Sequence, residues 1–479
     1  MSHWFNPLET AFSEVLAHLT TWLFFPIFGL PAIVLWSIAG TVILSLRLRF
    51  VNLRCLPEAV TLLRIHNQSP QGVSSFQAFT TALSGTVGLG NIAGVAIAIS
   101  VGGPGACLWM TVAGLLTMNT RLIECTLGRT YRETHEDGTV SGGPMYYLRH
   151  GLAAQGKKRW GKILAAGFAL CCIGASLGSS GMFQAGQSYR ALAHVLPDLA
   201  PAHYGLGLAL AVGLVTWGGI HRIGQVTAWL VPVMCGLYVG AALVIVVSHG
   251  QELPGAIALI WHDAWNPKAG LGGAVGMMVL GFQRAAFSNE GNIGTAAIAH
   301  AATEGTTPVQ EGIIATLEPL VDTVVICNLT ALVIILTGAY QAPEYAQFAG
   351  AELTSAAFGQ AIAWFPWILA IATLCFAFST ILAWGYYGQQ AWGYLFGQRH
   401  RGLYHSLQLS LVFVGTVIRP ELVVQISDLA LLLMAVPNLC GLYSLTGEVR
   451  SELQAHFSPG TFSPDRMQPK QRSGQGSNL

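Results

Sequence analysis

Charged residues are scarce in this chain, and their scarcity excludes an ordinary soluble fold. Only 9% of the 479 residues are Asp, Glu, Lys or Arg, whereas 53% are hydrophobic. Soluble domains carry about a quarter charged residues, and every charge placed in hydrocarbon is energetically costly. The composition therefore predicts an all-α integral membrane protein. A formal net charge of +1 gives no reason to expect a nucleic-acid partner.

Motifs of enzymes and metal sites are also missing from the sequence. It contains no Walker loop, no His-Glu-x-x-His and no Gly-x-Ser-x-Gly. Gly88-Leu-Gly90 follows no strand pattern, so it is not a dinucleotide fingerprint. The nine cysteines lie mostly in apolar runs without metal-ligand spacing, which favours packing roles. We therefore expect no enzymatic activity, no cofactor and no obligate protein partner.

What the chain does have is a series of apolar runs near the length of about 20 residues that a membrane span requires. We predict about eleven spans. They cover 24–46, 79–101, 104–126, 163–192, 205–219, 226–248, 272–299, 313–337, 364–392, 405–418 and 422–445.

Basic residues in the short loops predict the orientation of these spans. Four arginines lie from Arg47 to Arg64, and seven Lys or Arg residues lie from Arg129 to Lys162. Eleven spans with the N-terminus outside and the C-terminus in the cytoplasm place both groups inside. We expect a multi-pass protein of the inner (plasma) membrane, in direct contact with the lipid bilayer.

Two of the predicted spans are interrupted by glycine and polar residues at mid-membrane. They are the first span after the N-terminal one, around Gly85–Gly94, and the stretch Gly281–Gly294. A glycine inside a helix costs about 1 kcal/mol relative to alanine. Non-helical backbone is tolerated at this depth only where it is buried in protein or lines a cavity. Paired broken helices of this kind are typical of secondary transporters with inverted repeats.

With the first span set aside, the ten remaining spans divide into five plus five, each half beginning with a broken helix. An odd number of spans per half makes the two halves inverted in the membrane. We predict an extra N-terminal span and cytoplasmic loop at 1–78, a first repeat at 79–248 and a second at 249–445. Residues 446–479 are predicted to be a disordered cytoplasmic tail.

The first broken helix offers two kinds of ligand. A half-helix N-terminus carries partial positive charge and free N–H groups that suit a carboxylate. Freed carbonyls and the oxygens of Ser84, Thr86 and Asn91 suit a hard cation such as Na⁺. The alternative is that the glycines only permit close helix packing.

Further polar residues lie inside apolar runs. Ser288 and Asn289 are expected to be direct ligands, whereas Arg284 and Glu290 fit either a functional role or a structural ion pair. Ser379 and Thr380 offer two hard oxygens, or hydroxyls that bond back to their own helix. Gln184 must face inward because an unpaired amide in lipid is costly. Asp322 and Asp428 fit structural pairing or cation binding equally well.

These motifs resemble those of the alanine/glycine:cation symporter family, the sodium:alanine symporters, from about Leu30 to Leu445. The matching strings are Ala82-Leu-Ser-Gly-Thr-Val-Gly-Leu-Gly-Asn-Ile-Ala-Gly94, Gly142-Gly-Pro-Met-Tyr-Tyr147, Phe287-Ser-Asn-Glu290 with Ala299-His-Ala301, and Phe378-Ser-Thr380. The resemblance implies the inverted-repeat fold shared with the neurotransmitter:sodium symporters. It also implies uptake of small neutral amino acids driven by Na⁺ or, in some members, by H⁺.

The resemblance also implies a set of site residues. The Gly90 amide and its neighbours would receive the substrate carboxylate, and a second cation would lie near Thr86 and Asn91. The sodium site would comprise Ser84, Val87, Phe376, Ser379 and Thr380. With Ser288 and Asn289 as direct ligands, and with Phe287 and Trp384 as candidate walls, the expected substrate site comprises Gly85, Thr86, Gly90, Asn91, Gln184, Phe287, Ser288, Asn289, Thr295 and Trp384.

We therefore expect a secondary active transporter that couples inward Na⁺ flow to uptake of alanine or glycine. Binding both ligands at one broken-helix site would couple them, because each stabilises the geometry that the other needs. The alternatives are an H⁺-coupled amino-acid symporter and a passive channel for a small polar solute. A channel keeps a continuous pore and needs no ion gradient, and the paired broken helices argue against it.

Overall fold

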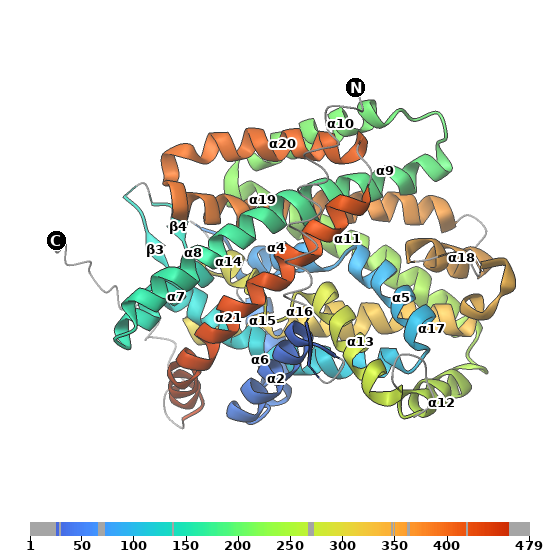
Figure 1. The fold of residues 1–479 in the computed structure, drawn as a ribbon, viewed down its shortest axis with the longest axis horizontal. Helices are drawn as coiled ribbons and strands as arrows, with labels where there is room; N and C mark the ends of the chain where they lie inside the picture. The colour runs from blue at the N-terminus through green and yellow to red at the C-terminus, as the bar shows by residue number, and fades with distance from the viewer. Residues whose placement is uncertain are drawn as a thin grey trace.

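The computed structural model is almost entirely helical (Figure 1). It describes residues 25–27, 30–65, 72–136, 138–266, 273–345, 348, 350–361, 365–417 and 420–458. The side chain of Asp428 lies outside this described set.

The first half of the chain begins with the predicted N-terminal span. The helix of this span starts at Ala32 rather than near 24, because a two-residue pairing of β1 (Pro26–Ile27) with β2 (Leu30–Pro31) occupies part of the predicted range. The helices that follow are α2 (Ala32–Arg47), α3 (Val51–Ile65), α4 (Ser75–Thr86), the π-helix η1 (Gly90–Gly94), α5 (Val95–Gly102) and α6 (Ala106–Thr130). After them come β3 (Glu133–Thr134), β4 (Val140–Ser141), α7 (Pro144–Ala154), α8 (Lys158–Ala175), the π-helix η2 (Ser176–Phe183), α9 (Gln184–Val195), α10 (Pro201–Thr216) and α11 (Gly219–Ser248).

The second half contains the other broken span. Its elements are α12 (Leu253–Ala264), α13 (Gly273–Asn289), α14 (Ala296–His300), α15 (Pro308–Ala315), α16 (Leu317–Pro319), the π-helix η3 (Leu320–Cys327) and α17 (Asn328–Leu336). The 3-10 turns η4 (Ala339–Gln341) and η5 (Pro343–Tyr345) lead to α18 (Ala351–Ala361), α19 (Phe365–Phe396), η6 (Gln398–His400), α20 (Arg401–Val417) and α21 (Pro420–Phe457).

Within the described residues, six helical segments are long and apolar enough to cross a membrane, or up to eight if each of two bent pairs counts as one span. The bent pairs are α2 with α3, at 78°, and α4 with η1 and α5, at 49°. The chain is thus a multi-pass helical bundle, as predicted. The count of eleven spans and the five-plus-five repeat stay predictions, because α10, α13 and α20 are shorter than a regular span.

One boundary was predicted wrongly. The tail was expected to be disordered from residue 446, but α21 continues as a helix to Phe457. Leu445, Val449 and Leu453 are all buried, so the apolar face continues beyond the predicted span and keeps the helix packed. The remainder of the predicted tail, 459–479, lies outside the described residues.

The interior of the bundle holds the two breaks. α10 and α20 pack together along one edge of the molecule, α2 lies toward the opposite edge, and α4 lies between them (Figure 1). α19 packs on α4, α8, α9 and α11, and α13 packs on η1 and α6. This arrangement buries the polar residues Ser84, Asn91, Ser288 and Ser379.

Candidate functional site

The first break begins where α4 stops. Ser74 and Gln77 form a reciprocal capping box that fixes the start of α4, and the regular helix ends at Thr86. The Asn91 side chain then folds back, so that its Oδ1 accepts from the Gly88 amide at 2.8 Å. One amide of the unwound backbone is therefore satisfied by a side chain, as a buried N–H group requires.

The predicted sodium residues cluster between α4 and α19. The Thr380 hydroxyl donates to the Ser84 carbonyl at 2.8 Å, and the Ser84 hydroxyl lies 3.3 Å from the Ser379 carbonyl. Ser379 bonds back to the Phe376 carbonyl at 3.0 Å. Val87, the fifth predicted member, is buried at the end of α4. Thr380 therefore reaches across to the first break, whereas Ser379 takes the back-bonded arrangement that was the alternative for both.

A second cluster joins the two breaks through Asp322. The Asn91 amide donates to Asp322 Oδ1 at 2.8 Å and to Ser288 Oγ at 3.0 Å. The Ser288 and Thr323 hydroxyls each donate to Asp322 Oδ2 at 2.8 Å. A fully buried carboxylate is thus surrounded by donors from η1, α13 and η3. Sequence reasoning singled out Asp322 without finding these partners.

The second break lies at 290–295, toward the end of the stretch predicted from the sequence. α13 stays helical to Asn289, and then Glu290, Asn292 and Gly294 take φ values of 51°, 69° and 89°. Positive φ is costly for residues with a side chain, so neighbours must hold this turn. Arg121 donates to the Asn289 carbonyl at 2.6 Å.

Further buried contacts fix the same turn. Asn438 donates to the Asn292 carbonyl and to Glu124, each at 2.6 Å. Glu124 in turn lies 3.2 Å from Arg121. The strained segment is therefore held in place by a buried ion pair and an amide that bond its backbone.

Glu290 holds two of the predicted substrate residues. Its Oε1 accepts from Trp384 Nε1 at 2.8 Å and its Oε2 accepts from the Thr295 hydroxyl at 2.5 Å. The Arg284 guanidinium lies over the Phe287 ring, 6.0 Å from its centre. Glu290 thus braces Trp384 and Thr295 across the second break.

The glycines of the first break face different neighbours. A Cβ added to Gly90 would lie 3.0 Å from Ser288 Cα and 3.1 Å from the Phe287 carbonyl, both backbone atoms of α13. At Gly85 it would meet Tyr387 at 3.5 Å and Trp384 at 3.7 Å. The geometry at Gly90 is therefore that of two broken helices in direct backbone contact.

The hydrogen bonds of the remaining predicted polar residues go to residues outside the predicted site. Thr86 bonds back to the Leu83 carbonyl at 3.1 Å. Asn289 bonds its own turn at Gly291 and donates to Thr323. Gln184 begins α9 directly after η2, and its buried Oε1 has no hydrogen-bond partner among the described residues. π-helical turns inside α-helices, such as η2, are frequent at functional sites.

A chain of buried ionisable groups lies behind the second break. His300 contacts Glu311 at 2.7 Å and Glu318 at 2.5 Å, and Glu318 lies 3.2 Å from Arg121. Cys125, His300 and Glu318 place potential metal-ligand atoms within 4.8 Å of one another. Because His300 and Glu318 bond each other directly, we assign this group to hydrogen bonding that supports the break.

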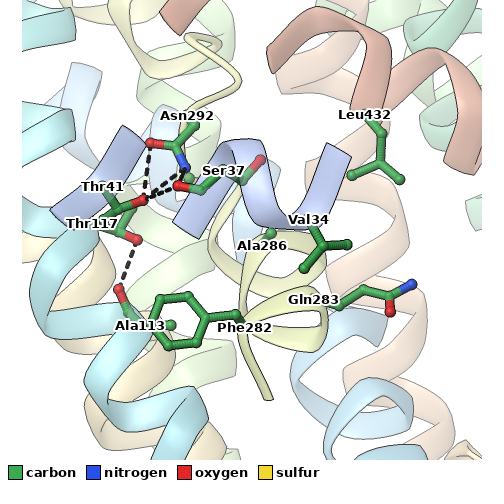
Figure 2. Close-up of a pocket in the computed structure, with 11 residues that line it drawn as sticks. Val34, Ser37, Thr41, Ala113, Thr117, Phe282, Gln283, Ala286, Asn292 and Leu432 are labelled. Atoms are coloured by element: carbon green, nitrogen blue, oxygen red, sulfur yellow. Dashed lines mark hydrogen bonds between the residues drawn. The ribbon is translucent and has the colours of Figure 1, made fainter. Parts of the chain in front are cut away.

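Two cavities lie outside the predicted site. A small one, of about 20 Å³, adjoins the second break between α2, α6, α13 and α21 (Figure 2). Asn292 and Thr41 bond each other at its wall, at 2.9 Å, and Thr117 bonds the Ala113 carbonyl. Its size suits one water molecule. The other, of about 500 Å³, is bordered by loops, by α19 and by the start of α20.

Known proteins match this chain along most of its length. A model of the sodium:alanine symporter family matches residues 12–462. An uncharacterized transporter of Haemophilus influenzae is 39% identical over 90% of this chain and 94% of its own length. The sodium/alanine symporter AgcS of Methanococcus maripaludis is 36% identical over 89% of this chain and 94% of its own. The crystal structure of MhsT in complex with L-phenylalanine covers 78% of this chain and 89% of MhsT, with a TM-score of 0.53 and 13% identity. That last likeness concerns the fold alone.

Proposed function

Because the chain belongs to the sodium:alanine symporter family, we propose that it carries alanine or glycine into the cell together with Na⁺. Family membership confirms the resemblance read from the sequence motifs and makes the chain a multi-pass membrane transporter. The substrate, the direction of transport and the residues of the site belong to the proposal. The orientation, with the N-terminus outside and the C-terminus in the cytoplasm, is also part of the proposal, as is the location in the inner membrane.

One observation carries the sodium part of the proposal. Thr380 on α19 bonds the Ser84 carbonyl at the end of α4, at 2.8 Å, next to the oxygens of Ser379 and Phe376. Hard cations take oxygen ligands from carbonyls and hydroxyls. When the hydroxyl hydrogens turn away, the same oxygens present their lone pairs to Na⁺. Val87 would add a carbonyl from the first unwound residue.

The Asp322 cluster supports a second cation position. It adds a carboxylate to the Asn91 amide and the Ser288 hydroxyl, all buried. Asn91 follows the first break and Ser288 precedes the second, so a cation held there would fix the breaks relative to each other. That geometry supports the second position expected near Thr86 and Asn91.

The substrate would lie between the breaks and α19. Gly85 faces the Trp384 and Tyr387 side chains, which leaves little room beside its Cα. Trp384 is held by Glu290, so this wall is rigid. Gln184 offers an unmet carbonyl oxygen to an ammonium group. These features support a substrate with a small side chain.

Uptake by the purified protein in sealed lipid vesicles tests the function. We expect labelled alanine or glycine to accumulate against its gradient when Na⁺ is outside, and serine to compete better than leucine or phenylalanine. Replacing Na⁺ with choline should stop accumulation, even with a proton gradient present. Equal uptake in choline driven by protons would establish the H⁺-coupled alternative, and equilibration without accumulation would establish a channel.

A further inference from the structure

The larger cavity, of about 500 Å³, is formed away from the Ser84 and Asp322 clusters. None of the predicted site residues lines it. Its walls come from the chain before α4, the β3–β4 hairpin, the α10–α11 turn, the segment after α14, the second half of α19 and the start of α20. Its lining includes Val73, Glu304, Gln389, Gln390, Arg401 and His405.

Helices of the proposed site lead directly to this cavity. α19 carries Thr380 at the site and Gln390 at the cavity wall, ten residues apart, which is about 15 Å along a helix. α4 begins two residues after Val73, another wall residue, and carries Ser84. The lining loops belong to the basic side of the protein, which the positive-inside rule assigns to the cytoplasm. In the proposed orientation, with the C-terminus in the cytoplasm, the cavity lies between the proposed site and the cytoplasmic face.

Two residues of α20 that line the cavity have hydrogen-bond donors without partners in the described part of the chain. Arg401 Nε and Nη2 and His405 Nδ1 are buried and have no hydrogen-bond partner within the described ranges. His405 Nε2 lies 2.8 Å from the Gln389 amide nitrogen, which only donates. The neutral ring therefore carries its hydrogen on Nδ1. Arg401 and His405 are one helical turn apart, so a charged and a neutral donor lie on the same face.

An opposite charge borders the same cavity. Glu304 follows α14 and is exposed. The walls thus combine a guanidinium on α20 with a carboxylate on a different segment. A zwitterionic amino acid carries both complementary charges, and charge-assisted hydrogen bonds to a carboxylate are among the strongest that a guanidinium makes.

We propose that this cavity is a release subsite, in which Arg401 and His405 receive the carboxylate of the transported amino acid on its way to the cytoplasm. The proposal rests on the proposed function. It assigns to α20 a role in substrate binding from the cytoplasmic face, and it predicts that the subsite has no influence on binding from outside.

The test compares Arg401→Gln with Arg399→Gln in vesicles of known orientation. Arg399 is exposed in η6, has the same charge and does not line the cavity. The half-saturating alanine concentration is measured separately from each face. We expect Arg401→Gln to raise it by about tenfold from the cytoplasmic face, as the loss of a charge-assisted hydrogen bond would. Arg401→Lys should recover part of the loss, and Arg399→Gln should match the wild type.

An unchanged outer-face value in Arg401→Gln also shows that the variant is folded. Equal shifts at both faces, or no shift at either, would overturn the proposal. It is also overturned if cytoplasmic phosphate or chloride changes the wild-type value but not that of Arg401→Gln, because the donors then serve a free inorganic anion. If the wild-type protein transports no amino acid, the proposed function itself fails. Intact transport without the one-sided shift removes the release subsite alone.

Discussion

Alanine substitutions at the glycines of the first break should separate three effects. These are the contact with α13, Na⁺ binding at Thr380 and the space for substrate beside Trp384. The glycines differ in what a Cβ would meet. At Gly90 the nearest atoms are α13 backbone at 3.0 and 3.1 Å, at Gly88 the Thr380 hydroxyl at 3.5 Å, and at Gly85 the Trp384 and Tyr387 side chains. At Gly94 nothing lies within 4 Å, so Gly94→Ala is the matched control.

The magnitude follows from these distances. A contact of 3.0 Å with backbone cannot be relieved by a side-chain rotation, so the two broken helices must move apart. Overpacking of this kind costs about 1–3 kcal/mol, and tenfold in affinity corresponds to about 1.4 kcal/mol. We expect Gly90→Ala to weaken alanine and Na⁺ binding together, by about fivefold to a hundredfold, and to lower the melting temperature.

The other substitutions should be selective. The Cβ of Gly88→Ala would be in van der Waals contact with the Thr380 hydroxyl, at 3.5 Å, and the substitution should weaken Na⁺ more than alanine. Gly85→Ala should weaken alanine more than glycine, because it narrows the space beside Trp384. Gly94 has helical dihedrals, φ −63° and ψ −40°, and alanine there is expected to be neutral or slightly stabilising.

The assay is equilibrium binding of labelled alanine and glycine to each purified variant across a Na⁺ titration, with a melting curve for each. If Gly90→Ala bound both ligands as the wild type does, the contact with α13 would have no functional weight. If it lost substrate alone and kept its Na⁺ affinity and stability, the Gly90 amide would be a carboxylate ligand and the packing argument would be wrong.

Three further substitutions test the polar clusters. Thr380→Val removes the donor to the Ser84 carbonyl without changing the shape of the side chain. It should raise the half-saturating Na⁺ concentration for uptake at least about tenfold. An unchanged Na⁺ curve would contradict the proposed sodium site. Trp384→Phe leaves one Glu290 oxygen without its N–H donor, at a cost of about 1–3 kcal/mol, and should lower the melting temperature; equal melting curves would show that water replaces the donor. Asp322→Asn keeps the size but removes the charge, and should reduce the charge carried per alanine in electrical recordings; wild-type stoichiometry would remove Asp322 from cation binding.

The position of the first break could be predicted from the sequence because the residues that disfavour the helix lie within the break itself. Glycines that would each cost about 1 kcal/mol in a helix interior, mixed with polar groups in an apolar run, leave few explanations besides an unwound site. The structure places the break where these residues lie, between Thr86 and Gly90. The Asn91 fold-back onto the Gly88 amide needed coordinates, because it depends on the path of the turn.

The second break was located less well for the opposite reason. Gln283 and Arg284 are polar but good helix formers, and α13 continues through them. The residues that leave the helix, Glu290 and Asn292, are held at positive φ by Arg121 and Asn438 from helices remote in sequence. No local pattern records such support.

The π-helices and the partners of Asp322 were also beyond local reasoning. η3 contains Asp322 within a run of apolar residues, and the sequence signalled an unusual charge there. Hydrogen-bond donors from η1 and α13 reach its carboxylate, so the choice between structural pairing and cation binding depended on tertiary contacts. A lone acid in an apolar run indicates a polar centre without saying what completes it.

A balance of buried charges explains why a cation should accompany the substrate. Among the described residues, the fully buried carboxylates outnumber the buried cationic groups. The carboxylates are Glu124, Glu290, Glu311, Glu318 and Asp322, and the basic groups are Arg121, Arg129 and His300. With the carboxylates ionised, the buried core lacks two positive charges if His300 is protonated and three if it is neutral. A zwitterionic amino acid supplies no net charge, and uncompensated charge in a low-dielectric interior is costly. We infer that Na⁺, or protons on these carboxylates, meets the deficit, and that Asp322 makes cation binding and closure of the two breaks favour each other.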